Sequence, residues 1–366
     1  MDYNIYELII KPKSSFITNL ESDIIWGHIM WMMKYIEGEP KFKEILDEFN
    51  NGNPPFIVSN GFYTGYLPFY NNSTLNREDT DKLSEYIEGK SKLNTITALK
   101  EMKKVKEVSI DIFSQLREGK KSRDIIEECF KGERCPKCFD KQSKLLCEHG
   151  KKCKVFNNNK FEDYSSICKY NDKKVINIIE TKNSINRITD TTIDLDNEKG
   201  LFTQTEKYYS DDKTISIYFK VREDYNIDDL KKYFDFISKS GFGKRKSSGK
   251  GAFNIISFEK NSDIFKKLDN SNGYMVLSNY IPKEDDYENV VISNIMTKRG
   301  KLGGEYSFSG KPFKKPIVMY QPGSVFKLEN NVKNYDYYGK MQDNIHFNSK
   351  IVQYGYAFSV GVIVDE

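Results

Sequence analysis

A short segment, residues 240–253, combines backbone freedom with positive charge. Its glycines are Gly241, Gly243, Gly249 and Gly251, and its cations are Lys244, Arg245, Lys246 and Lys250. Glycine lets a backbone approach a ligand closely, and clustered cations neutralise phosphates. The pattern therefore predicts a loop that binds a polyanion, and a phosphate backbone is the expected partner.

The two common nucleotide-binding motifs do not explain this loop. A GxGxxG motif needs a glycine at position 246, where Lys246 stands, and the Walker spacing is not matched from any glycine of the segment. Residues 228–237 have helical periodicity, and residues 253–258 alternate like a strand. The loop thus joins a helix to a strand, which is the reverse of the order in Rossmann and Walker sites. A mononucleotide or dinucleotide site is not supported.

All six cysteines lie between residues 129 and 168. Cys135 and Cys138 have the spacing of a zinc knuckle, and Cys147 with Cys153 would complete a tetrahedral structural site. Cys129, His149 and Cys168 are the alternative ligands. Free thiols are the competing interpretation, whereas disulfides are not expected in a reducing cytoplasm. We expect a cytoplasmic location because Met1 and Asp2 lead into a strand-like segment rather than an export signal.

Overall charge carries little information about partners. The chain has 366 residues with 57 basic and 53 acidic side chains, a formal net charge of +4. Any nucleic-acid surface must therefore be a local patch. A length of 366 residues with 14% aromatic residues is enough for two packed domains.

The elements that would position the loop are predicted from periodicity. Residues 3–11 read as a strand, Ser22 as the N-cap of an amphipathic helix, and residues 51–70 as a short strand with structured turns. Residues 81–128 read as charged helices, whose solvated faces explain their lysines without an RNA contact. A strand over 214–221 and a helix capped by Asp228 precede the loop.

This order predicts an α+β fold of two RRM-like or ferredoxin-like domains. The first domain covers residues 1–262 and contains the glycine-rich loop, with residues 129–168 as a zinc-binding insertion. Residues 270–366 contain short strands and turns, which predicts a second, β-rich and degenerate RRM-like domain.

Several motifs outside the loop resemble a known family. They are Glu21–His28 with Trp31, Gly38–Glu39, Pro54–Phe62, Gly65–Pro68, Asn183–Thr192, Thr297–Gly300, Pro322–Phe326 and Val352–Ala357. In this order they resemble the fourth Csm subunit of type III-A CRISPR effector complexes, a member of the RAMP superfamily, of which the glycine-rich loop is a hallmark. The resemblance covers most of the chain outside residues 71–180, and the cysteine segment departs from it.

The resemblance implies a non-catalytic subunit of an antiviral Csm complex. Such a subunit holds the 5′ repeat-derived tag of the crRNA at the foot of the filament and bridges the large polymerase-like subunit and the backbone RAMP subunit. The loop residues would contact tag phosphates, and a second set would position RNA: Asn183, Asn186, Arg187 and Thr189. Their amide, guanidinium and hydroxyl groups suit phosphates, 2′-hydroxyls and base edges. Turn and surface chemistry is the alternative interpretation of Asn186 and Arg187.

Two other functions compete with this interpretation. A RAMP-type crRNA-processing endoribonuclease shares the fold and often uses histidine as a general acid or base. The chain has three histidines: His28 in an apolar helix, His149 among the cysteines, and His346 in a polar loop. A Tyr- and Lys-based mechanism would need no histidine. The other competitor is a stand-alone zinc-containing adaptor protein.

Overall fold

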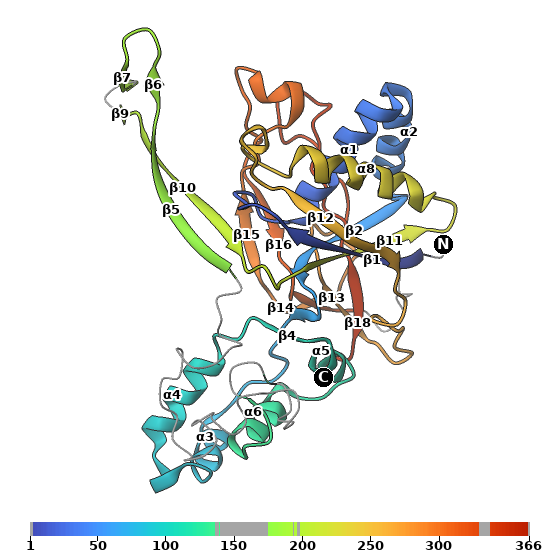
Figure 1. The fold of residues 1–366 in the computed structure, drawn as a ribbon. Coiled ribbons are helices and arrows are strands. Elements are labelled where there is room, and N and C mark those ends of the chain that lie inside the picture. The colour runs from blue at the N-terminus through green and yellow to red at the C-terminus, as the bar shows by residue number, and fades with distance from the viewer. Residues whose placement is uncertain are drawn as a thin grey trace.

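The computed structural model describes residues 3–135, 139, 175–192, 194–195, 198–328 and 337–364 (Figure 1). Its first sheet has the order β12-β1-β11-β2, with every neighbouring pair antiparallel. In chain order the elements of this unit are β1 (Tyr3–Pro12), α1 (Ser22–Glu37), α2 (Glu39–Asn50), β2 (Phe56–Tyr63), β11 (Ile215–Arg222), α8 (Ile227–Ser240) and β12 (Phe253–Lys260). Numbered as four strands, the order is 4-1-3-2, which is the ferredoxin-like arrangement predicted from the sequence.

Helices α1 and α8 lie side by side over one face of this sheet (Figure 1). The predicted apolar face of α8 is buried, including Leu230 and Phe234. Both predicted caps were wrong by one or two residues. Asn226, not Asp228, caps α8, by accepting a hydrogen bond from the Asp228 backbone amide at 3.1 Å. Ser22 lies inside α1, where its hydroxyl accepts from the backbone amide of Asn279 at 2.9 Å.

The second sheet has the order β14-β17-β13-β18 and is also antiparallel. Its strands are β13 (Gly273–Val276), β14 (Asn289–Ile292), β17 (Val325–Lys327) and β18 (Ser359–Val362), and a separate pair is formed by β15 (Ile295–Lys298) and β16 (Ile317–Tyr320). Read from β18, the order is again 4-1-3-2. Within the described part of residues 270–366 the helices of the RRM pattern are absent, and only the short η4 (Gly304–Phe308) is helical. The second unit therefore has the strand order of an RRM-like domain without helices on its sheet in the described residues.

Two inserted segments lie in the chain between β2 and β11, although these two strands are neighbours in the first sheet. The first is a helical module with β3 (Tyr66–Pro68), α3 (Arg77–Ser84), η1 (Glu88–Lys90), α4 (Lys92–Met102), β4 (Glu107–Ser109), α5 (Ile110–Arg117) and α6 (Ser122–Phe130). The second is a long hairpin of β5 (Val175–Asn183) and β10 (Leu201–Tyr209) that projects from the body in Figure 1. At its far end lie β6 (Ile185–Asn186) with β7 (Thr191–Thr192), and β8 (Asp194–Leu195) with β9 (Glu198–Lys199).

The predicted insertion, residues 129–168, falls within this long connection. Of its cysteines, Cys138, Cys147, Cys153 and Cys168 lie outside the described residues, as does His149. Cys129 and Cys135 are described, at the end of α6 and just after it.

The larger hydrophobic core contains residues of both sheets, and a smaller cluster around Tyr274 and Phe326 belongs to the second sheet alone. Trp26 of α1 stacks on Tyr354 with ring centroids 5.4 Å apart, and Phe49 of α2 contacts both rings. Ion pairs join the start of α1 to β15: Lys298 contacts the carboxylates of both Glu21 and Asp23. No described helix combines the length and apolar character needed to cross a membrane.

Because of this shared core, we expect Phe49→Ala to destabilise both halves together. Phe49 is fully buried, and removing such a ring costs about 3–5 kcal/mol. Thermal unfolding followed by far-UV and near-UV circular dichroism should remain one coincident transition at a lower temperature. Phe236→Ala, on the exposed side of α8, is the matched control and should change stability by less than about 0.5 kcal/mol. Separate transitions for the two halves would contradict a shared core.

Candidate nucleic-acid interface

The glycine-rich loop is held in place by backbone contacts with the chain segment that precedes α1. The amide of Gly251 donates to the carbonyl of Ser15 at 2.9 Å, and the amide of Lys244 donates to the Thr18 hydroxyl at 3.0 Å. Gly243 and Gly251 have positive φ, and a Cβ at Gly251 would lie 2.0 Å from the Phe242 carbonyl oxygen. Only glycine fits such a close approach, so these two residues shape the loop.

His28 of α1 forms part of this support. Its Nε2 atom accepts a hydrogen bond from the Gly243 amide at 3.1 Å, and its ring packs 4.5 Å from the Phe242 ring. Burial lowers the pKa of His28 to about 4, and the positive charge of Lys246 acts in the same direction. His28 is therefore neutral near pH 7 and has its acceptor nitrogen engaged. Its geometry is that of a support for the loop.

The predicted cations of the loop fall into two groups. Lys244, Arg245 and Lys246 are exposed, and Arg245 takes a left-handed backbone conformation with φ of 59°. Lys250 instead turns inward, with its Nζ atom 2.6 Å from the carboxylate of Glu206. Three of the four cations thus face solvent, whereas the fourth fastens the loop to β10.

Glu206 is the residue that the sequence reasoning missed. Its side chain is 0% exposed. Its two carboxylate oxygens accept hydrogen bonds from five side chains: Ser15 at 2.7 Å, Lys182 at 3.3 Å, Gln204 at 2.8 Å, Tyr208 at 3.0 Å and Lys250 at 2.6 Å. The hydrogen bond from Lys250, followed by that from Ser15, holds the pKa of this carboxyl well below its usual range. A glutamate within a strand pattern carries no sequence signal for such a role.

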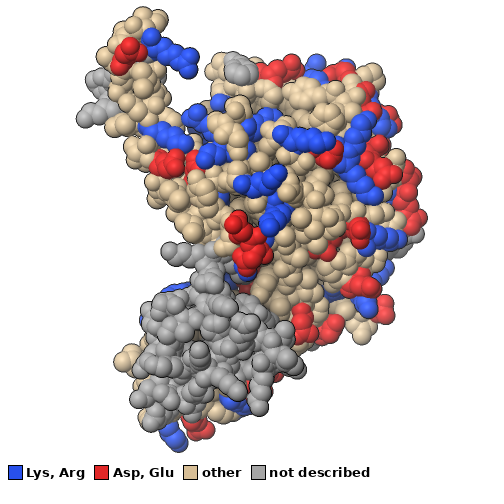
Figure 2. All heavy atoms as spheres, in the orientation of Figure 1, with Lys and Arg blue, Asp and Glu red and all other residues tan. Residues whose placement is uncertain are grey.

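The hairpin stands beside the loop. Arg245 lies 5.9 Å from the centre of the Phe202 ring on β10, and Phe16 pairs with Lys207 through two backbone hydrogen bonds of 2.8 and 2.9 Å. Figure 2 shows lysine and arginine side chains gathered where the projecting hairpin meets the body, with fewer acidic ones beside them. The loop and the hairpin strand from Phe202 to Lys207 therefore form one basic corner.

The second predicted set lies at the far end of the hairpin. Asn183 ends β5 and donates from its side-chain amide to the Thr192 hydroxyl at 3.0 Å, while Asn186 lies in β6 and pairs with Thr191. Arg187 and Thr189 are exposed at the tip. Six residues of strand, about 20 Å, separate the Lys207 contact from the hairpin end at Leu201. Arg245 of the loop reaches Phe202, which is one residue from the Leu201–Asn183 pair, so the set begins near the loop, at Asn183. The other three residues of the set lie further along the same projecting arm.

The predicted zinc ligands lie only partly within the described residues. The Cys129 thiol is buried and donates to the Cys135 carbonyl at 3.7 Å, and burial raises the pKa of Cys129. Among the described residues no three histidine, cysteine or acidic side chains are grouped as for a metal. Cys138, Cys147 and Cys153 lie outside the described part.

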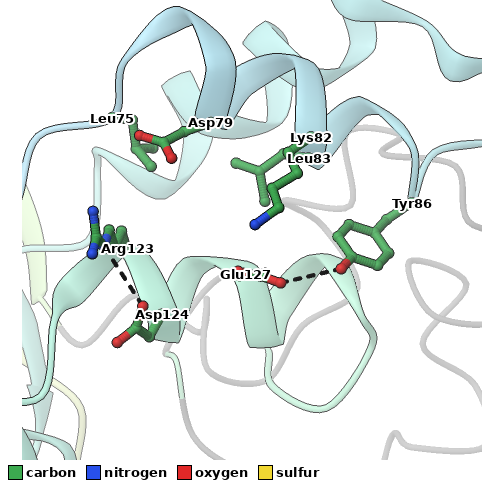
Figure 3. Close-up of a pocket in the computed structure, with 8 residues that line it drawn as sticks. All are labelled: Leu75, Asp79, Lys82, Leu83, Tyr86, Arg123, Asp124 and Glu127. Atoms are coloured by element: carbon green, nitrogen blue, oxygen red, sulfur yellow. Dashed lines mark hydrogen bonds and ion pairs between the residues drawn. The ribbon is translucent and has the colours of Figure 1, made fainter.

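A pocket of about 230 Å³ lies between α3 and α6 in the helical module (Figure 3). Its walls carry both charges, and several of these groups already have partners. Tyr86 donates to Glu127 at 3.1 Å, and Arg123 lies 3.7 Å from Asp124. The pocket therefore offers no concentrated charge for a phosphate, and we assign it no role.

Comparison with solved structures defines the class of fold. No family model matches the sequence, and no curated protein matches it significantly. A chain of the Csm3–Csm4 subcomplex of the type III-A CRISPR-Cas interference complex is similar with a TM-score of 0.61 and 14% identity, over 98% of this chain and 99% of that chain. Chains from the Csm1–Csm4 cassette, in complex with cA4 and with pppApA, give TM-scores of 0.54 and 0.52 at 14% and 12% identity, over 99% of both chains.

This chain therefore has the fold of a subunit found in these type III-A CRISPR structures. Csm4 is the subunit common to these structures, and the resemblance to the fourth Csm subunit drawn from the sequence motifs is confirmed at the level of the fold.

The buried carboxylate yields a prediction that needs no RNA. In Glu206→Gln, an amide would face the ammonium groups of Lys250 and Lys182, and we expect a loss of about 1–3 kcal/mol for an unsatisfied buried group. The folded-state pKa of Glu206 lies below its unfolded value of about 4.3, so its contribution is present above about pH 5 and is lost as the pH falls. Urea unfolding at pH 7 and pH 4 should therefore show a smaller difference between wild type and variant at pH 4.

Glu180→Gln is the matched control, because Glu180 pairs with the same Lys182 but has a side chain that is 40% exposed. Its expected effect is below about 0.5 kcal/mol at both pH values. An equal effect of the two substitutions would show that the buried carboxylate does not hold the loop.

Proposed function

We propose that this protein is a non-catalytic, crRNA-binding subunit of a type III-A CRISPR complex, with Csm4-like placement. It holds the 5′ tag at the foot of the filament and bridges the large polymerase-like subunit and a backbone RAMP subunit. The similar chains were solved together with Csm1 and with Csm3, which supports these two protein partners. The observation that carries the RNA assignment is the loop whose three exposed cations lie on a rigid, glycine-shaped backbone beside a projecting hairpin.

The non-catalytic part of the proposal is supported by the two described histidines. His28 accepts from the Gly243 amide, and its lowered pKa makes it a weak base. His346 accepts from the Asn348 amide at Nδ1, so its Nε2 donates to the Lys311 carbonyl at 2.8 Å. Both rings are thus engaged with the backbone. The competing assignment, a crRNA-processing endoribonuclease, would need a reacting group elsewhere.

The loop triple variant Lys244→Ala, Arg245→Ala, Lys246→Ala tests the RNA assignment. The plot of log affinity against log salt concentration has a negative slope, and the loss of each phosphate contact should reduce the magnitude of that slope by roughly 0.7, the single-strand value. Fluorescence anisotropy with a labelled repeat-derived RNA, measured over a range of salt concentrations, gives this slope. Lys250→Ala should change the slope less than any one of the three, because Lys250 is already neutralised by Glu206.

A salt slope unaltered by the triple substitution would refute RNA binding through the loop. The same samples, incubated with magnesium or manganese, should leave the RNA intact. Cleavage that disappears in a folded His28→Ala variant would favour the processing-enzyme assignment. Co-purification with the polymerase-like and backbone subunits tests the bridging role separately.

We also propose a structural zinc held by Cys135, Cys138, Cys147 and Cys153. Zinc binding contributes on the order of 10 kcal/mol to the folding of small metal-stabilised segments. Elemental analysis should give close to one zinc per chain, and Cys135→Ser with Cys138→Ser should remove it. Cys129→Ser, the control for a buried thiol outside the set, should retain the metal. Metal-free wild-type protein in which residues 129–168 resist proteolysis would exclude the site.

A further inference from the structure

A second basic surface lies outside the glycine loop, on a ribbon of the C-terminal half. Residues 299–302 run beside 312–314: Lys301 pairs with Phe313, and the Leu302 amide donates to the Pro312 carbonyl at 2.8 Å. A third segment joins them, because the Lys315 amide donates to the Ile345 carbonyl at 2.7 Å. The ribbon is therefore held by the backbone and has two defined faces.

Side chains alternate strictly between these faces. Arg299, Lys301, Lys311, Phe313 and Lys315 are exposed, and the residues between them within each segment are partly or fully buried. Lys314, for example, points inward, where its Nζ atom donates to the Val352 carbonyl at 2.7 Å. The outer face thus carries four cations and an aromatic ring. In the part of the chain that the structure describes, none of these four cations is in an ion pair, whereas the inward-facing Lys298 is paired twice.

Two exposed aromatic rings lie among these cations. The Arg299 guanidinium lies 5.4 Å from the Phe313 ring centre, and Lys311 Nζ lies 5.7 Å from that of Phe347. The rings are 48% and 68% exposed. Single-stranded nucleic-acid sites combine unpaired cations with exposed rings on which bases stack. A protein interface would instead be depleted of lysine at its centre, so the chemistry favours RNA.

Helix α1 connects this ribbon to the glycine loop. His28 accepts from Gly243 of the loop, and Trp31 packs against Gly304 of η4, two residues beyond the ribbon, where a Cβ would lie 2.5 Å from the Trp31 ring. The two residues are three positions apart, a rise of about 4.5 Å along the helix. The loop and the end of the ribbon are therefore supported by neighbouring residues of one helix.

From these contacts we infer that the outer face of the ribbon is a second subsite for single-stranded RNA, with bases stacked on Phe313 and Phe347 and phosphates bound by Arg299, Lys301, Lys311 and Lys315. The inference rests on the proposed function and extends it to residues outside the glycine loop and the hairpin.

The test uses the full chain and a fluorescein-labelled RNA of about 20 nucleotides that contains 5-iodouridine. Phe313→Leu with Phe347→Leu should weaken binding by about tenfold per ring, the effect expected for a base that no longer stacks. Arg299→Gln with Lys311→Gln should reduce the magnitude of the salt slope by roughly 1.4, twice the value for one phosphate contact. Photocrosslinks in the wild type should map to residues 299–315 or 346–347 as well as to the loop.

Lys266→Gln with Lys267→Gln removes the same charge from another exposed segment and should leave both slope and affinity unchanged. Crosslinks confined to residues 241–251, with unaltered binding by the ribbon variants and weakened binding by the loop triple variant, would overturn this inference and leave the proposed function standing. Absence of RNA binding by the wild type would overturn both. Ribbon variants that bind RNA normally but no longer assemble with the other Csm subunits would overturn the subsite and identify the face as a protein interface.

Discussion

The buried carboxylate of Glu206 holds together three segments that are far apart in the sequence. Ser15 comes from the segment before α1, Lys250 from the glycine-rich loop, and Lys182 from the opposite strand of the hairpin, and each donates a hydrogen bond to this one side chain. A buried charge is tolerated only when such partners surround it. Displacement of any one segment would therefore leave the Glu206 carboxylate with fewer partners and destabilise the fold. The spacing of the exposed loop cations relative to the hairpin follows from this arrangement.

Helix α1 is the second fixed element of the surface. Its buried side supplies Trp26 to the core shared by the two sheets, and within one turn His28 supports the loop and Trp31 packs against Gly304, just beyond the ribbon. The motif from Glu21 to Trp31 thus helps to position the basic glycine-rich loop although its own residues carry no Lys or Arg.

Sequence reasoning was most successful where local pattern and tertiary structure agree. The ferredoxin-like order, the buried face of α8 and the helix-to-strand position of the loop were all predicted from periodicity and glycine chemistry. The caps at Ser22 and Asp228 were misplaced because polar residues adjoin each other at both helix starts, and distant partners such as Asn279 decide what each side chain does. The role of Lys250 could not be predicted, since its partner Glu206 is 44 residues away in the sequence and belongs to a strand whose neighbours are known only from the fold.

The order of the strands also has a consequence for how the chain folds during synthesis. β1 pairs with β11, from Tyr3 opposite Arg222 onward, and with β12, so the first strand to be made has no partner until more than about 200 residues later. At about 5–20 residues per second, translation leaves both edges of β1 unpaired for roughly 10–40 s. Such an edge is a template for unwanted pairing with other chains. The helical module emerges during this interval. Its internal contacts, such as those of α3 with α4, are local and can form during translation, whereas the contact of α5 with β18 can form only at the end of synthesis.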